Sequence, residues 1–342
     1  MDVLTLGPLE VPPLAVGAMF WGTRVPGSTA HDLLDRAVDR GARFVDTANN
    51  YAFWQPGAVG DESETCLGEW IASRGRDRIV LATKIGARPA RPGAGTDDAL
   101  GLSRQAILDQ TADSLRRLRT DHVDLLYAHI DDPRVPMVET VGALQEVVER
   151  GWARAIAASN LTADRLAEAL RATGAGPRHV ALQNRFTFLP PAPGTDFGRQ
   201  VLLDEAMQDA CRAHDVAMVG YSTLLEGAYT RADRPLPEAY RQPGSDEALR
   251  TLATVAAETG LDAGQAVLSW LAHRPARVIP VIGASRPDQL DSAIAAVTTP
   301  MSAAAVAALD ARSRRLGWWA WRRMGDSNPR GLAPNTLSKR AP

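Results

Sequence analysis

Short apolar segments alternate with longer amphipathic segments from residue 14 to residue 297 of the 342-residue chain. The apolar segments are rich in Val, Ile, Leu and Ala, which is typical of buried strands, and the longer segments carry the periodicity of helices. A strand that is followed each time by a helix predicts parallel pairing, because a parallel connection needs a long crossover. The strands are predicted at residues 14–18, 43–46, 79–84, 123–129, 153–159, 179–184, 216–221 and 278–283. The clearest helices are predicted at residues 30–40, 104–118, 138–149 and 163–172.

Eight strand–helix units in succession predict an α/β protein with a (β/α)8 TIM barrel, although an open doubly wound sheet has the same order of elements. Residues 3–12, with Gly7-Pro8 at their centre, predict an N-terminal hairpin ahead of the first barrel strand. Long segments rich in Gly, Pro or polar residues follow three of the strands, at the C-terminal face where a barrel enzyme carries its substrate loops. These segments are residues 86–102, 185–199 and 223–244.

We expect one barrel domain over residues 1–324 and a disordered tail over residues 325–342. A single α/β barrel usually runs to about 250 residues and often to more with insertions, which fits this length. The final stretch is polar and lacks periodicity, so it has too little apolar surface to fold by itself.

Composition and charge argue against several classes of function. The chain holds 38 Lys and Arg against 40 Asp and Glu, so its formal charge of −2 gives no general attraction to nucleic acid or to an anionic membrane. No stretch approaches the roughly 20 apolar residues of a membrane span, and no secretory signal is visible. Cys66 and Cys211 lack the spacing of a metal or redox motif. We therefore expect a cytoplasmic protein without nucleic-acid or membrane partners, and nothing predicts its oligomeric state.

Three consecutive predicted strands end in an ionisable residue, namely Asp46, Lys84 and His129. In each strand, alternation places this last residue on the same face as the apolar residues that point into the barrel. Because neighbouring strands lie about 4.8 Å apart, the three groups should cluster at the C-terminal mouth of the barrel, where the active sites of this fold lie. An unpaired charge at that depth is costly, so we expect Lys84 to pair with Asp46. A structural salt bridge that closes the barrel is the alternative.

Tyr51 lies five residues after Asp46, just past the second predicted strand, and could lean back over the mouth. A phenol has a pKa near 10 in water. The nearby Lys84 ammonium is expected to lower that pKa, which would make the proton easier to donate at neutral pH. Together with Asp46, Lys84 and His129, this tyrosine favours a catalytic role over a purely structural one.

At these residues the sequence resembles the aldo-keto reductase superfamily. The resemblance covers roughly residues 3–312 and depends on an ordered series of short motifs. They are GAMFWG at 17–22, FVDTANNY at 44–51, ATK at 82–84, DLLYAH at 124–129, Ser159-Asn160, Gln183-Asn184, Gly220-Tyr221-Ser222 and IPVIG at 279–283. The resemblance implies an oxidoreductase that uses NADP, with NAD possible, to reduce a small-molecule aldehyde or ketone.

The resemblance also implies a role for each catalytic candidate. Tyr51 would be the general acid, which protonates the carbonyl oxygen as hydride reaches the carbon. Lys84, held by Asp46, would lower the pKa of Tyr51, and His129 would donate a hydrogen bond that orients the substrate oxygen. These donors would stabilise the charge that develops on that oxygen. A metal-dependent enzyme is not expected, because only His129 of the six histidines falls at a predicted strand end and faces inward.

A second group of residues is implied to bind the cofactor. Residues at the ends of the fifth and sixth strands would hold the carboxamide of the nicotinamide, and Tyr221 would stack on its ring. The backbone that follows Tyr221 would meet the pyrophosphate. A group after the last strand would hold the adenosine end, where Arg286 suits the 2′-phosphate of NADP through its forked donors. The full set is Trp21, Ser159, Asn160, Gln183, Tyr221, Ser222, Leu224, Gly227, Gly283, Ser285, Arg286 and Gln289.

The chain departs from the family pattern in places that bear on binding. Ala52 stands where the family usually has Gly, and residues 53–58 look inserted, which puts Phe53 and Trp54 beside the acid. Residues 292–293 are Ser-Ala where family members commonly carry an acidic–Asn pair that holds adenine. The preference for NADP over NAD therefore stays open.

The substrate is not predicted, although aromatic residues near the long loops suggest an apolar or aromatic wall. These are Phe186, Phe188, Trp318, Trp319 and Trp321, and the tryptophans could equally pack the C-terminal segment onto the barrel. The main rival hypothesis is a cofactor-binding sensor or regulatory subunit of the same fold with little turnover. The intact catalytic set argues against that rival.

Overall fold

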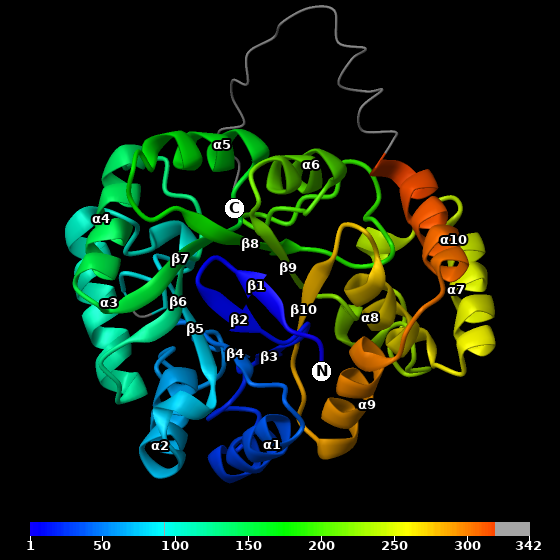
Figure 1. Ribbon diagram of the computed structural model, residues 1–342, viewed down its shortest axis with the longest axis horizontal. Coiled ribbons are helices and arrows are strands. Elements are labelled where there is room, and N and C mark those ends of the chain that lie inside the picture. The colour runs from blue at the N-terminus through cyan, green and yellow to red at the C-terminus, as the bar shows by residue number, and fades with distance from the viewer. Residues whose placement is uncertain (92, 319–342) are drawn as a thin grey trace, which may run out of the picture.

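The computed structural model describes residues 1–91 and 93–318, and within them eight parallel strands close into a barrel (Figure 1). Around the barrel the strands follow the order β10-β3-β4-β5-β6-β7-β8-β9, and β10 pairs with β3 to complete the ring. The predicted (β/α)8 barrel is confirmed. The open-sheet alternative is wrong, because an open sheet would leave two unpaired edges. The tail predicted at residues 325–342 lies outside the described residues.

The barrel strands coincide with the predicted apolar segments, and their ends differ by no more than one residue. They are β3 (Ala15–Gly17), β4 (Phe44–Asp46), β5 (Val80–Ile85), β6 (Val123–Ala128), β7 (Ala153–Ser159), β8 (His179–Arg185), β9 (Ala217–Tyr221) and β10 (Val278–Ile282). The agreement is close because a strand that is buried on both faces reads as a continuous apolar run bounded by polar or Gly residues.

The predicted N-terminal hairpin is also present, and it closes the N-terminal end of the barrel. It consists of β1 (Leu4–Leu6) and β2 (Leu9–Val11), which lie across the centre of the barrel in Figure 1. Its turn requires glycine at Gly7, where φ is +55° and a Cβ atom would come within 2.4 Å of the Val180 side chain. The hairpin leaves the opposite, C-terminal mouth for the site.

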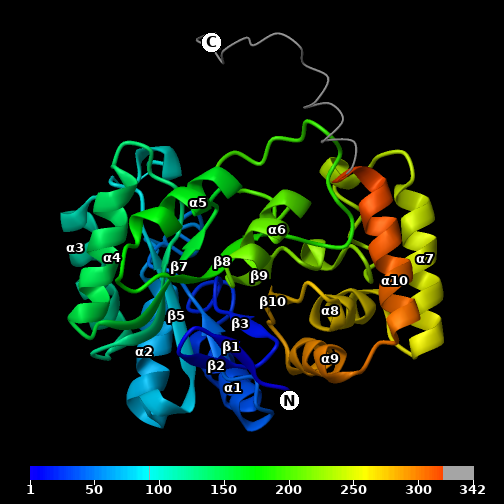
Figure 2. The same cartoon turned by 45° about the horizontal axis from the view of Figure 1, so that its top comes forward.

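Eight helices surround the barrel and cover the outer faces of its strands (Figure 1). They are α1 (Gly27–Asp39), α2 (Glu62–Arg74), α3 (Arg104–Leu118), α4 (Met137–Glu149), α5 (Ala163–Ala172), α6 (Glu205–Ala213), α8 (Ala263–His273) and α9 (Pro287–Thr298). Two further helices, α7 (Ser245–Thr259) and α10 (Ala303–Ser313), pack side by side against α8 on one flank (Figure 2). Short helical turns are η1 (Arg76–Arg78), η2 (Thr96–Asp98), η3 (Leu225–Gly227), η4 (Glu238–Tyr240) and the π-helical η5 (Arg314–Trp318).

Within the described residues the hydrophobic core has two large parts, and a small third cluster joins Ala87, Ala99 and Ile130. The larger part fills the layer between the strands and the helices. The smaller part fills the barrel with inward residues such as Phe44, Ala82 and Leu125, and it includes the apolar residues of the N-terminal hairpin. Because the interior is packed with side chains and is not an open channel, polar chemistry is confined to the last residues of the strands at the mouth.

Within the described ranges, no individual helix has the length and apolar character needed to cross a membrane. Only Pro287–Thr298 and Ala303–Leu316 taken together reach that length, and they meet at an angle of 108°. The same residues hold no group of three or more His, Cys, Asp or Glu side chains arranged to bind a metal ion.

His179, at the start of β8, should make the fold sensitive to acid. The side chain is 2% exposed, and burial lowers the pKa of its imidazole from 6.5 to about 4. Below pH 6.5 the unfolded chain therefore binds a proton that the folded chain does not, so stability is full above this pH and falls as the pH is lowered towards 4. We expect the free energy of unfolding to drop by about 3 kcal/mol across this window.

Urea unfolding of the wild type and of His179→Leu at a series of pH values measures this contribution. The comparison is needed because the pKa of other groups, His129 among them, is also shifted in the folded chain. As the pH falls from about 6.5 to about 4, the wild type should lose about 3 kcal/mol more of its free energy of unfolding than His179→Leu. Parallel stability curves for the two proteins would contradict the assignment to His179.

Candidate active site

Asp46 and Lys84 form a buried ion pair at the mouth of the barrel, as the sequence predicts. Asp46 is the last residue of β4. It is paired with Ala82 of the neighbouring β5, two residues before Lys84, and both side chains of the ion pair are completely buried. The Lys84 Nζ bonds the Asp46 carboxylate, the backbone oxygen of Thr47 at 2.9 Å and the hydroxyl of Tyr51 at 2.5 Å. An ammonium has three N–H donors, so all three of them are used. This arrangement compensates for burial of the charge.

Tyr51 leans back over the mouth, and its hydroxyl lies between the two charged groups. It accepts the hydrogen bond from Lys84 and donates one to the Asp46 Oδ1 at 3.1 Å. The ring lies 4.6 Å from the Lys84 Nζ and meets the His129 ring edge to face, with centroids 5.9 Å apart. The structure therefore brings together all four catalytic candidates.

Electrostatics at Tyr51 correct one expectation. The sequence predicts that Lys84 lowers the pKa of the phenol, but in the structure the pKa of Tyr51 is raised well above 10. Burial is the main cause, and the Asp46 carboxylate adds to it. Burial also lowers the pKa of Lys84 from its ordinary 10.5, and Asp46 offsets part of this effect. The resting phenol is therefore fully protonated at neutral pH, and its proton is held by Asp46.

His129 lies directly after β6, where backbone contacts fix its position. Its N–H donates to the carbonyl of Ile85 at 2.8 Å, and its carbonyl accepts from the Asn160 Nδ2 at 3.0 Å. Burial, and then the charge of Lys84, lowers the pKa of the imidazole well below 6.5, so the ring is neutral at neutral pH. A neutral imidazole has one N–H to offer to a ligand. The Nδ1 atom is buried and has no hydrogen-bond partner within the described ranges.

Gln183 in β8 holds Asp46 from the side opposite to Lys84. Its Nε2 donates to the Asp46 Oδ2 at 2.8 Å, across 137 positions of sequence. The family resemblance implies a place for Gln183 in the carboxamide clamp but does not reveal this bond, since nothing in a single sequence shows which strand-end amide meets which carboxylate. The bond fixes both oxygens of Asp46 and thereby the position of Lys84.

The other two proposed clamp residues are Ser159, the last residue of β7, and Asn160, which follows it. Both form hydrogen bonds with neighbouring segments. The Ser159 Oγ donates to the carbonyl of Gln183 at 2.6 Å. Asn160, which has a left-handed φ of +58°, accepts hydrogen bonds at its Oδ1 from the Tyr221 hydroxyl at 2.7 Å and from the N–H of Val201 at 3.1 Å. Ser159, Asn160 and Tyr221 therefore lie together at one side of the mouth. Tyr221 is only partly buried, so part of its ring is available to a ligand.

The backbone after β9 turns sharply through residues in the left-handed region. Ser222 has a φ of +58°, and Leu225, Glu226 and Gly227 have φ values of +47°, +57° and +94°. The turn is closed by the Leu225 N–H, which donates to the Ser222 carbonyl at 3.2 Å, and by the Gly227 N–H, which donates to the Leu224 carbonyl at 2.9 Å. Such turns present backbone N–H groups in the manner of anion-binding sites. The predicted pyrophosphate segment has a suitable local shape.

The residues expected at the adenosine end cluster at the N-terminus of α9. Gly283, Ser285 and Arg286 are exposed, and the Gln289 Oε1 accepts from the Ser285 N–H at 2.9 Å. The Arg286 guanidinium forms a two-pronged ion pair with Asp288, with distances of 3.0 and 2.9 Å. A helix N-terminus with an arginine beside it suits a phosphate. Asp288 competes for that arginine.

Trp21 follows β3 and is buried, and its part in cofactor binding stays a prediction. Its ring is 2% exposed and belongs to the core between the strands and the helices, and its Nε1 has no hydrogen-bond partner in the part of the chain described. Trp21 and Val25 are joined by a backbone bridge.

The expected aromatic wall also differs from the prediction. Phe186 and Phe188 are 3% and 0% exposed and pack against Trp270, with ring centroids 6.0 and 5.7 Å away. Both belong to the core between the strands and the helices. Trp319 and Trp321 lie outside the described residues, as does the side chain of Trp318.

Aromatic rings do gather at the rim close to Tyr51, where the sequence suggests an insertion. The Trp54 ring is 49% exposed and meets Phe20 and Phe53 edge to face, with centroids 6.4 and 5.2 Å apart. Ala52, which precedes this cluster, has a φ of +62°. Glycine is the residue that adopts this conformation without strain, which fits the Gly that is usual there in the family resemblance.

Comparisons with known proteins agree with this geometry. The model of the Aldo/keto reductase family matches residues 13–314. The norsolorinic acid reductase stcV of Emericella nidulans is 32% identical over 315 residues, which cover 87% of this chain and 77% of that protein. The uncharacterized oxidoreductase YrpG of Bacillus subtilis is 29% identical over 304 residues, 84% of this chain and 88% of that protein. The crystal structure of the thermostable aldo-keto reductase Tm1743 with the inhibitor epalrestat has a TM-score of 0.70 and 25% identity, covering 91% of this chain and all of that one.

Proposed function

Because this chain belongs to the aldo/keto reductase family, we propose that it is an NADP-dependent reductase that converts an aldehyde or ketone to an alcohol, with Tyr51 as the general acid. Membership of this family makes it an oxidoreductase that uses a nicotinamide cofactor. The observation that carries the finer proposal is the contact of the Lys84 ammonium with both the Asp46 carboxylate and the Tyr51 hydroxyl.

When bound, the nicotinamide cofactor supplies a hydride to the carbonyl carbon of the substrate. Tyr51 donates its proton to the carbonyl oxygen, so its hydroxyl becomes a phenolate. The Lys84 Nζ, already 2.5 Å from that oxygen, then holds a full negative charge in place of a neutral hydroxyl. A preorganised charge aimed at the atom where negative charge develops is stabilising in a site that excludes water. The Lys84 ammonium would therefore stabilise the Tyr51 phenolate and offset the burial that raises the pKa of the resting phenol.

His129 is proposed to orient the substrate. Its imidazole is neutral because burial lowers its pKa, and one ring N–H can donate to the carbonyl oxygen. The edge-to-face contact with Tyr51 places the two donors on the same side of the mouth. A carbonyl oxygen that accepts from both is held for proton transfer and polarised towards attack at carbon.

The residues around the mouth are suited to a dinucleotide. Tyr221 is partly exposed beside Asn160, and the turn after it presents a concave backbone. The N-terminus of α9 offers exposed donors to a phosphate, and Arg286 would contact the 2′-phosphate of NADP. The choice of NADP over NAD rests on this arginine alone.

Arg286→Ala should weaken NADPH binding by about tenfold and change NADH binding by less than about twofold, because only NADPH carries the 2′-phosphate. Fluorescence titration with each cofactor measures both constants. Arg212→Ala is a matched control, since it removes an exposed arginine that is likewise paired with a nearby aspartate, Asp209 on α6. An equal loss of affinity for both cofactors would remove Arg286 from the 2′-phosphate site.

The proposal as a whole is tested by titrating the protein with NADPH and NADH side by side. A panel of aldehydes and ketones is then supplied with the better cofactor, and oxidation is followed by the loss of nicotinamide absorbance. We expect turnover with at least one carbonyl and formation of the alcohol. Cofactor binding without turnover across the panel would instead favour the sensor or regulatory subunit, a role that the name of one relative carries, the probable voltage-gated potassium channel subunit beta of Arabidopsis thaliana. The partner is proposed to be a small-molecule carbonyl, and the cytoplasmic location stays a prediction.

A further inference from the structure

Three loops meet at the mouth beside His129, and one arginine joins them. The loops follow β5 (residues 86–103), β6 (residues 129–136) and β8 (residues 186–204). The joining residue is Arg199 in the third of these loops. Its role follows from how each loop is fixed.

The loop after β5 folds back on itself as a hairpin with two arms, residues 88–90 and 98–100. The arms are joined by the Ala90 N–H to the Asp98 carbonyl at 2.7 Å and by the Leu100 N–H to the Arg88 carbonyl at 2.8 Å. The base of this hairpin is attached to the segment that leads to Tyr51, because the Arg88 Nη1 donates to the carbonyl of Asn49 at 2.6 Å. The hairpin therefore starts beside the proposed acid.

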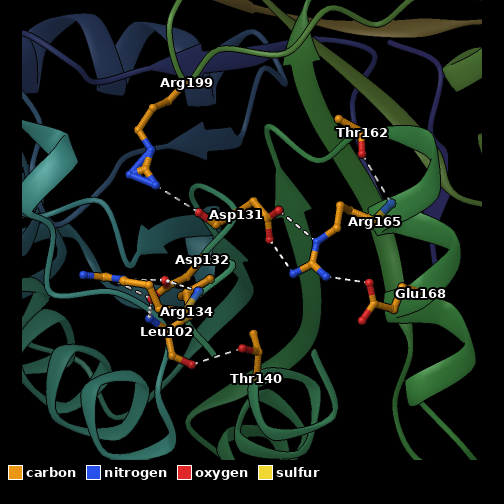
Figure 3. A network of polar contacts seen from close by, with 9 residues as sticks. All are labelled: Leu102, Asp131, Asp132, Arg134, Thr140, Thr162, Arg165, Glu168 and Arg199. Carbon is orange, nitrogen blue, oxygen red and sulfur yellow. Dashed lines mark hydrogen bonds and ion pairs between the residues drawn. The ribbon is translucent and has the colours of Figure 1, made fainter. Parts of the chain in front are cut away.

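The far end of the hairpin is held by Arg199. Its Nη1 donates to the carbonyl of Thr96 at 3.0 Å, and its Nη2 donates to the carbonyl of Asp131 at 3.4 Å. Figure 3 shows Arg199 reaching down to the main chain of Asp131, whose carboxylate points the other way, to Arg165. One guanidinium thus connects the hairpin to the loop that carries His129. A planar fork with several donors is suited to two carbonyls at once.

The loop after β6 provides a firm support for this contact. The Asp131 carboxylate accepts two hydrogen bonds from Arg165 on α5, both at 2.8 Å. The next residue, Asp132, is 4% exposed and accepts from the N–H of Leu102 at 3.0 Å and from Arg134 at 2.7 Å (Figure 3). The Asp131 carbonyl that meets Arg199 is therefore fixed from both sides.

The segment that carries Arg199 is equally well fixed. Two residues further on, the Val201 N–H donates to the Asn160 Oδ1 at 3.1 Å, and the Val201 carbonyl accepts from the Arg185 N–H at 2.9 Å. The Leu203 N–H then donates to the Arg185 carbonyl at 2.9 Å. Arg199 and the Asp131 carbonyl are thus both anchored to barrel strands. One arm of the hairpin is held separately, because the Arg134 Nη2 donates to the carbonyl of Ala99 at 3.2 Å and Ala99 packs against Ala87 and Ile130. The contact of Arg199 with Thr96 holds the hairpin beyond this arm.

We propose that Arg199 is a positioning residue for the carbonyl substrate. It keeps the hairpin after β5 in place across the mouth, from Tyr51 on one side to the loop of His129 on the other, before the substrate arrives. Because this hairpin is already ordered, substrate binding does not carry the entropic cost of ordering it. The inference rests on the proposed function, and it adds a residue that touches neither the reacting atoms nor the cofactor.

Arg199→Ala should raise KM for the carbonyl by about tenfold and change kcat by less than about twofold, because Tyr51 and His129 are held by other contacts. The dissociation constant of NADPH should stay the same. Arg199→Lys, which keeps the charge but loses the fork, should have an intermediate KM. Arg91→Ala is the matched control: it removes an exposed arginine of the same loop, paired with Asp98, and should leave KM unchanged.

Amide hydrogen exchange of the ligand-free protein gives a second measurement that needs no turnover. Peptides that contain residues 88–100 should exchange faster in Arg199→Ala than in the wild type, while peptides from the barrel strands should not change. A fall in kcat at constant KM, unchanged exchange in the hairpin, or faster exchange throughout the chain would each overturn the proposal. If the wild type reduces no carbonyl, the proposed function fails, and the exchange data still decide whether Arg199 holds the hairpin.

Discussion

Replacing Tyr51 with phenylalanine should lower kcat for carbonyl reduction by about 10²-fold or more, because the carbonyl oxygen loses its proton donor. The change removes one hydroxyl and leaves the ring contact with His129 in place. Binding of the cofactor should change little, since the proposed cofactor residues lie at other strand ends. Steady-state kinetics and a fluorescence titration of NADPH separate the two effects.

Tyr127→Phe provides the control for this experiment. Tyr127 lies in β6, is completely buried inside the barrel, and its ring is 5.7 Å from the Lys84 Nζ. Its substitution removes a phenolic hydroxyl near the same ammonium but below the mouth. We expect kcat to stay within about threefold of the wild type. A kcat that survives in Tyr51→Phe would show that another group delivers the proton.

Lys84→Met should lower kcat about as strongly, by roughly 10²-fold, because the phenolate that forms at Tyr51 would no longer be stabilised by an ammonium. It should also destabilise the fold by about 3–5 kcal/mol, since the Asp46 carboxylate would remain buried without its charged partner. Kinetics and urea unfolding of the same preparation measure the two losses.

The double substitution Asp46→Asn with Lys84→Met distinguishes the two roles of the pair. With both charges removed, the buried carboxylate no longer lacks a partner, and the Gln183 amide still has an oxygen to donate to. Stability should recover most of the loss, while activity should stay low. Recovery of activity together with stability would mean that Lys84 serves the fold and not the chemistry.

The barrel and the cluster of polar residues at its mouth could be predicted because both follow from local rules. Each strand is a short apolar run, and its last inward residue must lie at the mouth, so Asp46, Lys84 and His129 had to approach one another. Tyr51 could be added because it is only five residues from Asp46. For these residues, position within or just after a strand is enough to predict that the side chains lie close together.

The contacts that depend on loops or on distant pairs could not be predicted. Gln183 reaches Asp46, and Arg199 reaches Thr96, across 137 and 103 positions of sequence. No periodicity indicates which residues of two long loops will meet.

The pKa of Tyr51 was mispredicted for a different reason. The sequence shows that an ammonium lies near the phenol, but not how deeply the group is buried. Desolvation disfavours the phenolate more strongly than the ammonium favours it. The balance between these two effects depends on packing density, which becomes visible only in the folded structure.

The N-terminal hairpin also bears on how Tyr51 would be reprotonated between turnovers in the proposed mechanism. Leu6, Leu9 and Val11 close that end with apolar side chains, and above them the interior holds residues such as Phe44 and Leu125. Among the described residues, this apolar end does not favour the passage of a proton through the barrel. In the proposed mechanism, the phenolate at Tyr51 would therefore regain its proton from solvent at the open, C-terminal mouth. Proton uptake and product release would then use the same opening.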